Sequence, residues 1–227
     1  MAAALRVFVL RQPWTLAQPQ LQPGLGQSPG IPVLLVHGYI CNHRVWDDLA
    51  AALRARGHTV LAINLEPLFC SIVRYAPLVE QGVNQLCQQT GAPQVALVGH
   101  SMGGLALRAW LRACGNQRAA RVITLGTPHA GTHIAPHAPS ANGQQMVWHS
   151  RWLQDLAASE SPATRALLRI ALTPQDNIVY PQREQVLPGV PVTVFDGLGH
   201  LQLCLAPAVI AWVIAELAEL AELTTTP

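Results

Sequence analysis

The chain has 227 residues, of which 50% are hydrophobic and 11% are charged, and its formal net charge is +2. This length and composition are typical of a single domain with a large buried core. The sequence contains no run of lysine or arginine, which argues against nucleic acid as a partner. No stretch of the sequence reaches the roughly 18 uncharged apolar residues that a membrane-spanning helix requires.

The five cysteines are odd in number and lack a C-x-x-C spacing. They therefore predict buried thiols in a reducing compartment rather than a zinc site or a disulfide framework. The first ten residues are a poor match for a signal peptide, because their short apolar run is interrupted by Arg6 and follows no basic region. We therefore expect a cytoplasmic location.

The N-terminal part of the chain differs in composition from the rest. Residues 12–32 are rich in proline, glutamine and glycine and show no sustained hydrophobic period. We interpret residues 1–31 as a tail or an irregular approach strand that runs over the surface. Residues 32–227 are then expected to form one domain.

Strand and helix patterns alternate through this domain. Apolar and β-branched runs predict strands at residues 33–36, 59–63, 95–98, 121–125, 169–172 and 190–195. Apolar residues at helical spacing predict helices at residues 44–56, 71–90, 101–114 and 207–223. This alternation predicts an α/β fold with a mostly parallel central sheet and helices on both faces. Ligands bind at the carboxyl ends of the strands in such sheets, so candidate site residues are sought there.

The most informative stretch is the G-x-S-x-G motif at residues 99–103, which follows a predicted strand and leads into a predicted helix. A serine on such a sharp turn is held in strained backbone geometry that lifts its hydroxyl to the edge of the sheet. The free N–H groups at the start of the helix favour negative charge that develops there. We therefore predict that Ser101 is a nucleophile.

A serine hydroxyl is a weak nucleophile and needs a histidine base, which a carboxylate must orient. His200 follows the last predicted strand in a glycine-rich loop, and we predict that it is the base. Asp176 lies in the loop after the strand at residues 169–172 and is the predicted acid. Asp196 is the alternative acid, although it precedes His200 by only four residues.

Acyl transfer through serine also requires main-chain N–H groups that stabilise an oxyanion. Met102, the residue after the nucleophile, is expected to provide one of them. The second is expected from the loop after the first strand, at Tyr39 in the sequence His37-Gly38-Tyr39.

These motifs resemble those of the α/β-hydrolase superfamily, and within it the bacterial lipase and esterase group, which includes triacylglycerol lipases. The matching segments lie in the family's order between about residues 32 and 205, at residues 36–39, 99–104, 125–132, the Asp176 loop and the Gly199-His200 loop. The resemblance implies hydrolysis of carboxylic esters through an acyl-enzyme without a cofactor. It also implies that His37 braces the oxyanion loop. The single glycine of that loop departs from the H-G-G-G form and leaves the acyl preference open.

Residues 131–161 change in composition just before the strand that carries the acid. Family members often carry a lid at this place, and we predict Trp148, Trp152 and Leu201 as substrate-binding residues. One hypothesis is a short lid that gates an apolar site or contacts a lipid surface transiently. The alternative is a core helix that covers the sheet.

Three histidines recur every four residues in this region, at His129, His133 and His137. On a helix they would form a metal site, but Pro128 and Pro136 interrupt the helix, so we predict structural roles and no metal.

The sequence thus predicts a serine hydrolase that cleaves small-molecule or lipid esters with an apolar acyl group, with no protein partner implied. The alternatives are a thioesterase or acyltransferase on the same scaffold and a catalytically silent binding protein.

Overall fold

The structure is a computed structural model that describes residues 2–12, 19–26 and 30–225. Its centre is a sheet of six parallel strands in the order β2-β1-β3-β4-β5-β6. The strands are β1 (Gly30–Val36), β2 (His58–Ile63), β3 (Val95–His100), β4 (Ala119–Leu125), β5 (Leu168–Leu172) and β6 (Val192–Val194). The predicted parallel α/β sheet is therefore confirmed. Its last strand is shorter than predicted, because it pairs with β5 only from Val192 to Val194.

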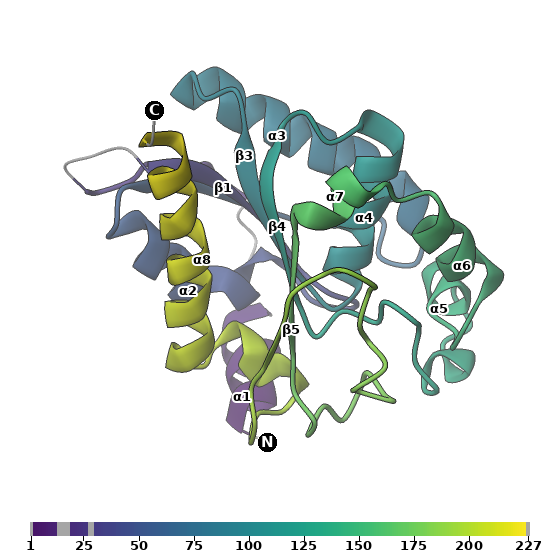
Figure 1. Ribbon diagram of the computed structural model, residues 1–227. Coiled ribbons are helices and arrows are strands. Elements are labelled where there is room, and N and C mark those ends of the chain that lie inside the picture. The colour runs from purple at the N-terminus through teal and green to yellow at the C-terminus, as the bar shows by residue number, and fades with distance from the viewer. Residues whose placement is uncertain (1, 13–18, 27–29, 226–227) are drawn as a thin grey trace.

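Helices cover both faces of the sheet. Figure 1 shows α3 (Ala76–Thr90) and α4 (Met102–Cys114) on one face, and α2 (Asp47–Arg54) and α8 (Pro207–Thr225) on the other. The segments η3 (His43–Trp46) and η4 (Ile72–Tyr75) are 3-10 turns that precede α2 and α3. None of the helices in the described ranges is both long and apolar enough to cross a membrane.

The pleat of β1 divides the core into two clusters. Leu34 and Val36 pack with the residues of α3 and α4, whereas Val33 and Leu35 pack with those of α2 and α8. All four side chains are fully buried, as expected for a parallel strand that is covered on both faces. In the sheet, β2 lies on one side of β1, whereas β3 to β6 follow in order on the other side, so the direction in which strands are added reverses between β1 and β3. The reversal places the β1 and β3 loops side by side at the carboxyl ends, which is where such sheets bind ligands.

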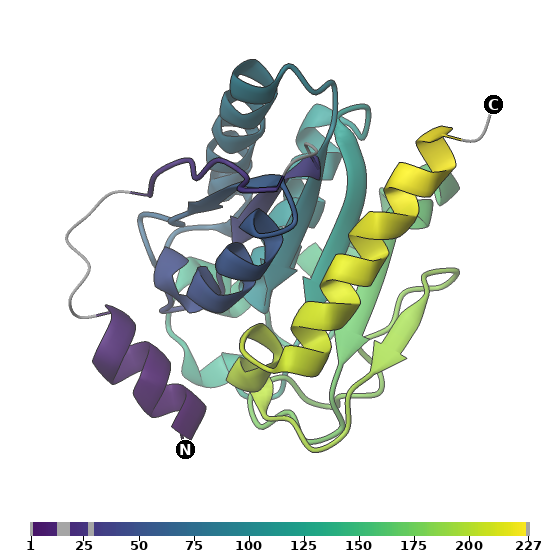
Figure 2. The ribbon, with the colours of Figure 1, turned by 90° about the vertical axis from the view of Figure 1, so that its left-hand side faces the viewer.

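The sequence predicts a tail or an approach strand at residues 1–31, of which residues 1, 13–18 and 27–29 lie outside the described residues, and the structure differs from this prediction at residues 2–11. Residues 2–11 are helical, with α1 (Ala2–Ala4) continued by the wider turns of η1 (Leu5–Arg11), and are called the N-terminal helix below. Val7 is fully buried, and this burial explains why the segment is ordered against the domain. Gln22 forms a single antiparallel bridge to Val60. Figure 2 shows the N-terminal helix on the outside of the molecule.

The segment of residues 131–161 contains three short helices. They are η5 (Ala135–His137), α5 (Ala141–Gln145) and α6 (Arg151–Ala158), and α7 (Pro162–Ala166) follows them. Leu153 and Leu156 of α6 are buried, and Trp152 packs against the core cluster that contains α4. These contacts favour the interpretation of α6 as a helix that covers the core.

Candidate active site

Ser101 lies on the turn between β3 and α4 with a backbone φ of 54°. This conformation is unfavourable for a residue with a side chain and requires support from the surroundings. The Ser101 N–H donates to the carbonyl oxygen of Leu125 at 2.9 Å, and its carbonyl oxygen accepts from Gly104 N–H at 3.1 Å. A Cβ atom on Gly103 would lie 2.2 Å from the carbonyl oxygen of Val36. The motif therefore needs glycine at this position so that the turn can pack against β1.

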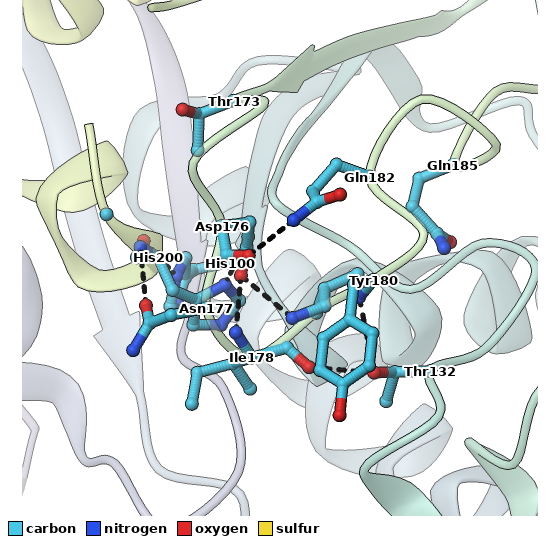
Figure 3. Close-up of polar contacts among 12 residues, drawn as sticks. His100, Thr132, Thr173, Asp176, Asn177, Ile178, Tyr180, Gln182, Gln185 and His200 are labelled. Atoms are coloured by element: carbon cyan, nitrogen blue, oxygen red, sulfur yellow. Dashed lines mark hydrogen bonds and ion pairs between the residues drawn. The ribbon is translucent and has the colours of Figure 1, made fainter. Parts of the chain in front are cut away.

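His200 and Asp176 form a buried pair at the carboxyl ends of the strands. His200 begins η6 (His200–Cys204), and its Nδ1 donates to Asp176 Oδ2 at 2.7 Å. The other carboxylate oxygen of Asp176 accepts the N–H groups of Ile178 and Val179, both at 2.8 Å. Figure 3 shows the two side chains pointing toward each other. Because Nδ1 carries the donated hydrogen, Nε2 of His200 is left as the basic nitrogen.

Further hydrogen bonds connect the loops that carry the acid and the base. Gln182 Nε2 donates to the carbonyl oxygen of Asp176 at 2.7 Å, as drawn in Figure 3. Thr173 Oγ1 donates to the carbonyl oxygen of Leu198 at 2.7 Å and so joins the acid loop to the loop of His200. These side chains hold the backbone on both sides of the pair.

A second histidine supports His200 from within the core. His100 Nε2 donates to the carbonyl oxygen of His200 at 3.1 Å, and the two rings have centroids 4.5 Å apart. Burial, followed by the neighbouring His200, holds the pKa of His100 well below its ordinary value. His100 is therefore neutral near pH 7 and adds no positive charge beside the base.

The loop after β1 is fixed by His37. Its Nε2 accepts the N–H of Leu65 at 2.9 Å, so its Nδ1 carries the hydrogen and donates to the carbonyl oxygen of Gly38 at 2.8 Å. Burial lowers the pKa of His37 to about 4, which keeps this arrangement neutral. The bond orients the peptide unit that contains the N–H of Tyr39. Within the described residues, that N–H has no hydrogen-bond acceptor.

Gly38 and Met102 complete the surroundings of the nucleophile. A Cβ atom on Gly38 would lie 2.8 Å from Cβ of Ser101, so the loop passes directly beside the serine. Met102 is the first residue of α4, and N–H groups in a first helical turn have no acceptor within the helix. Both predicted oxyanion donors therefore lie on segments that border Ser101.

Ser101 and His200 line a cavity of about 540 Å³, which is in the size range of small-molecule sites. Leu201, one of the three predicted substrate-binding residues, also lines it. Trp148 and Trp152 are not among the lining residues. Trp148 instead packs against His133, with ring centroids 5.0 Å apart. The cavity is mainly apolar, with Phe8, Tyr39, Ile40 and Ile178 in its wall.

The three regularly spaced histidines do not gather at one place. His129 is buried, and its Nε2 lies 3.0 Å from Thr124 Oγ1, while its Nδ1 lies 3.2 Å from a guanidinium nitrogen of Arg108. Burial lowers the pKa of His129 well below its ordinary value. In the described part of the chain, no three histidine, cysteine or acidic side chains are grouped as a metal site.

Some residues of the site were not recognised from the sequence. His100 lies inside the motif, but its bond to a carbonyl 100 residues away has no sequence signal. Gln182 follows the acid loop without belonging to a pattern. Phe8 lies in the short apolar run at the N-terminus, which was considered only as a targeting signal. His100 and Phe8 depend on contacts between distant segments, whereas Gln182 contacts a carbonyl only six residues away without a recognisable pattern.

Comparisons with known proteins identify the family of the chain. A family model described as the alpha/beta hydrolase fold matches residues 31–172. The chain belongs to the α/β-hydrolase family. The resemblance predicted from the motifs is thereby confirmed.

Curated relatives of this α/β-hydrolase include two bacterial triacylglycerol lipases. The protein of Pseudarthrobacter phenanthrenivorans is 36% identical over 113 residues, which are 46% of this chain and 35% of that protein. The protein of Burkholderia plantarii is also 36% identical over 113 residues, with 46% and 31% covered. The chain spans about a third of the length of these curated relatives.

Solved structures share the fold over most of the chain. The mature form of a Bacillus licheniformis lipase matches with a TM-score of 0.76 and 16% identity, covering 86% of this chain and 96% of that one. Aspergillus fumigatus lipase B matches with a TM-score of 0.70 and 18% identity, covering 83% of this chain and 52% of that one. At these identities the likeness concerns the fold.

Proposed function

We propose that this α/β-hydrolase is a serine hydrolase that cleaves carboxylic esters with an apolar acyl group. The observation that carries the proposal is the buried hydrogen bond between His200 and Asp176, beside a serine that lines the same cavity. An oriented histidine and a strained serine that line one cavity are the combination that nucleophilic catalysis requires.

In the first half of the reaction, Ser101 Oγ forms a bond to the ester carbonyl carbon while His200 Nε2 takes the hydroxyl proton. The carbonyl oxygen becomes an oxyanion that accepts the N–H groups of Tyr39 and Met102. The bond from carbon to the alkoxy oxygen then breaks, and the alcohol leaves with the proton from His200. Asp176 stays ionised and stabilises the imidazolium throughout.

In the second half, water replaces the alcohol. His200 takes a proton from the water as its oxygen bonds to the acyl carbon. The bond to Ser101 Oγ then breaks, and the proton returns to the serine. The products are a carboxylic acid and the regenerated enzyme.

The preference for an apolar acyl group follows from the wall of the cavity. Burial of each methylene in such a site is worth about 0.8 kcal/mol, so an acyl chain is favoured over a charged group. The substrate is then a small-molecule or lipid ester. The names of the curated relatives, which are triacylglycerol lipases, support this class.

The test is hydrolysis of p-nitrophenyl acetate and p-nitrophenyl octanoate by the intact protein and by Ser101→Ala. We expect the variant to lose at least about 10⁴-fold in kcat on both esters, because it lacks the hydroxyl that takes the acyl group in the proposed mechanism. Retained hydrolysis in a folded Ser101→Ala protein would contradict the proposal. An added alcohol that takes most of the acyl groups would instead indicate an acyltransferase.

A further inference from the structure

The N-terminal helix forms part of the catalytic cavity. Ala3, Ala4 and Phe8 line the cavity together with Ser101 and His200. The helix is in contact with η6, which begins at His200, and with η3, which follows the oxyanion loop. A segment from the far end of the sequence therefore faces the two reacting side chains.

The helix is held in place by one buried side chain and by ion pairs. Val7 is fully buried in the core cluster that contains Trp46 and Leu49. Arg6 and Arg11 approach the same oxygen of Asp48, at 3.0 and 2.8 Å. Because Phe8 follows Val7 directly, these contacts also fix where Phe8 lies.

Phe8 stands between two hollows. One is the catalytic cavity, and the other is an adjoining hollow of about 380 Å³ that also contacts His37, Asn64 and Leu68. Phe8, Ile40 and Cys41 are common to both linings and so form the partition between them. Ile40 and Cys41 belong to the loop after β1, whereas Phe8 comes from the N-terminal helix.

We propose that Phe8 is the end wall of the acyl pocket and sets the length of the acyl chain that the enzyme accepts. This inference rests on the proposed ester hydrolysis. An acyl chain that extends from Ser101 fills the apolar cavity until it meets the partition. A smaller side chain at position 8 joins the two hollows and accommodates more methylenes, whereas a larger one shortens the pocket.

The test compares p-nitrophenyl butyrate with p-nitrophenyl dodecanoate for variants of Phe8. We expect Phe8→Ala to raise the dodecanoate-to-butyrate ratio of kcat/KM about tenfold, which two additional buried methylenes suffice to give. Phe8→Leu should lie between Phe8→Ala and the intact protein, and Phe8→Trp should lower the ratio.

The matched control is Leu5→Ala, on the same helix. Leu5 is 54% exposed and lines neither hollow, so its removal should leave the ratio unchanged. An unchanged or lowered ratio in Phe8→Ala, or an equal rise in Leu5→Ala, would overturn the inference. If the inference fails in this way, butyrate hydrolysis that persists in Phe8→Ala and disappears in Ser101→Ala would show that the proposed ester hydrolysis still holds.

Discussion

The floor of the cavity comprises Ser101, His200 and the groups that are hydrogen-bonded to His200, and its outer wall is the N-terminal helix. The floor is held by hydrogen bonds between buried groups, whereas the outer wall is held by one buried side chain and by ion pairs near the surface. On the floor, the carboxylate of Asp176 accepts three hydrogen bonds of 2.7–2.8 Å, and the carbonyl of His200 accepts a fourth bond of 3.1 Å. In the wall, Val7 and the bonds to Asp48 carry the N-terminal helix.

This difference corresponds to two tasks. Proton transfer and oxyanion stabilisation require groups that are fixed to within a fraction of an ångström, and buried hydrogen bonds provide that order. Recognition of an acyl chain depends on volume and apolar surface, which a helix held by one buried side chain and by ion pairs near the surface provides. Substitutions in the floor should therefore lower the rate for every ester, whereas those in the wall should change which ester is preferred.

The largest effect is expected when the carboxylate of the floor is changed. Asp176→Asn keeps the shape but removes the charge that orients His200, and we expect kcat to fall about 10³- to 10⁴-fold on short and long esters alike. Asp196→Asn is the matched control, since Asp196 was the alternative acid, and it should retain activity within about threefold. A larger loss of activity in Asp196→Asn than in Asp176→Asn would show that Asp176 is not the acid.

The next effect concerns the stability of the folded protein at acid pH, to which His37 in the loop after β1 contributes. The pKa of His37 is lowered by burial from 6.5 to about 4, so between these values the unfolded chain binds a proton that the folded protein does not. This difference in proton binding leaves the stability of the folded protein nearly unchanged above pH 6.5. It lowers the stability progressively as the pH falls from 6.5 toward 4. We expect His37 to lower the free energy of unfolding by roughly 2 kcal/mol between pH 7 and pH 5.

Urea unfolding of the intact protein and of His37→Gln at pH 7 and pH 5 measures how much His37 changes the free energy of unfolding between the two pH values. The variant should show a pH dependence that is smaller by the same amount, whatever its stability at pH 7. An identical pH dependence in both proteins would contradict the assignment.

A smaller effect is expected for the bond that supports the base. His100→Leu removes the donor to the carbonyl of His200, and we expect kcat to fall about tenfold while KM changes less than twofold. His100→Gln, which keeps an N–H donor at a similar distance, should retain most of the rate. Equal losses in both variants would show that the ring is needed only for packing.

The smallest effect is expected for the two tryptophans of residues 131–161. Neither Trp148 nor Trp152 lines the cavity, so alanine at both positions should leave the ratio of octanoate to acetate hydrolysis within about twofold of the intact protein. The lid hypothesis from the sequence predicts instead a selective loss on the long ester. Steady-state kinetics on the two esters distinguish the two hypotheses.

The sequence predicted those features that depend on local patterns. The positions of all six strands follow from apolar runs, and the elbow follows from a motif in which each glycine has a steric reason. Asp176 and His200 were selected because the carboxyl ends of parallel strands lie at one edge, and the structure brings them within 2.7 Å.

The wall of the cavity could not be predicted in the same way. Val7 packs against α2 and Arg11 pairs with Asp48, contacts that join residues about 40 positions apart and leave no periodic signal. A proline- and glutamine-rich stretch lies between these segments and indicated a loose connection. The sequence predicts that the tryptophans bind substrate because they lie where family members often carry a lid, although bulky apolar residues pack equally well against a core.

The most direct test of the central claim is covalent labelling of the nucleophile. An alkyl fluorophosphonate reacts with an activated serine, and the labelled site is then located by peptide mass spectrometry. The account predicts one adduct on the peptide that contains Ser101, none in Ser101→Ala, and slower labelling in Asp176→Asn. An adduct on another residue, or ester hydrolysis that continues without any adduct on Ser101, would contradict it.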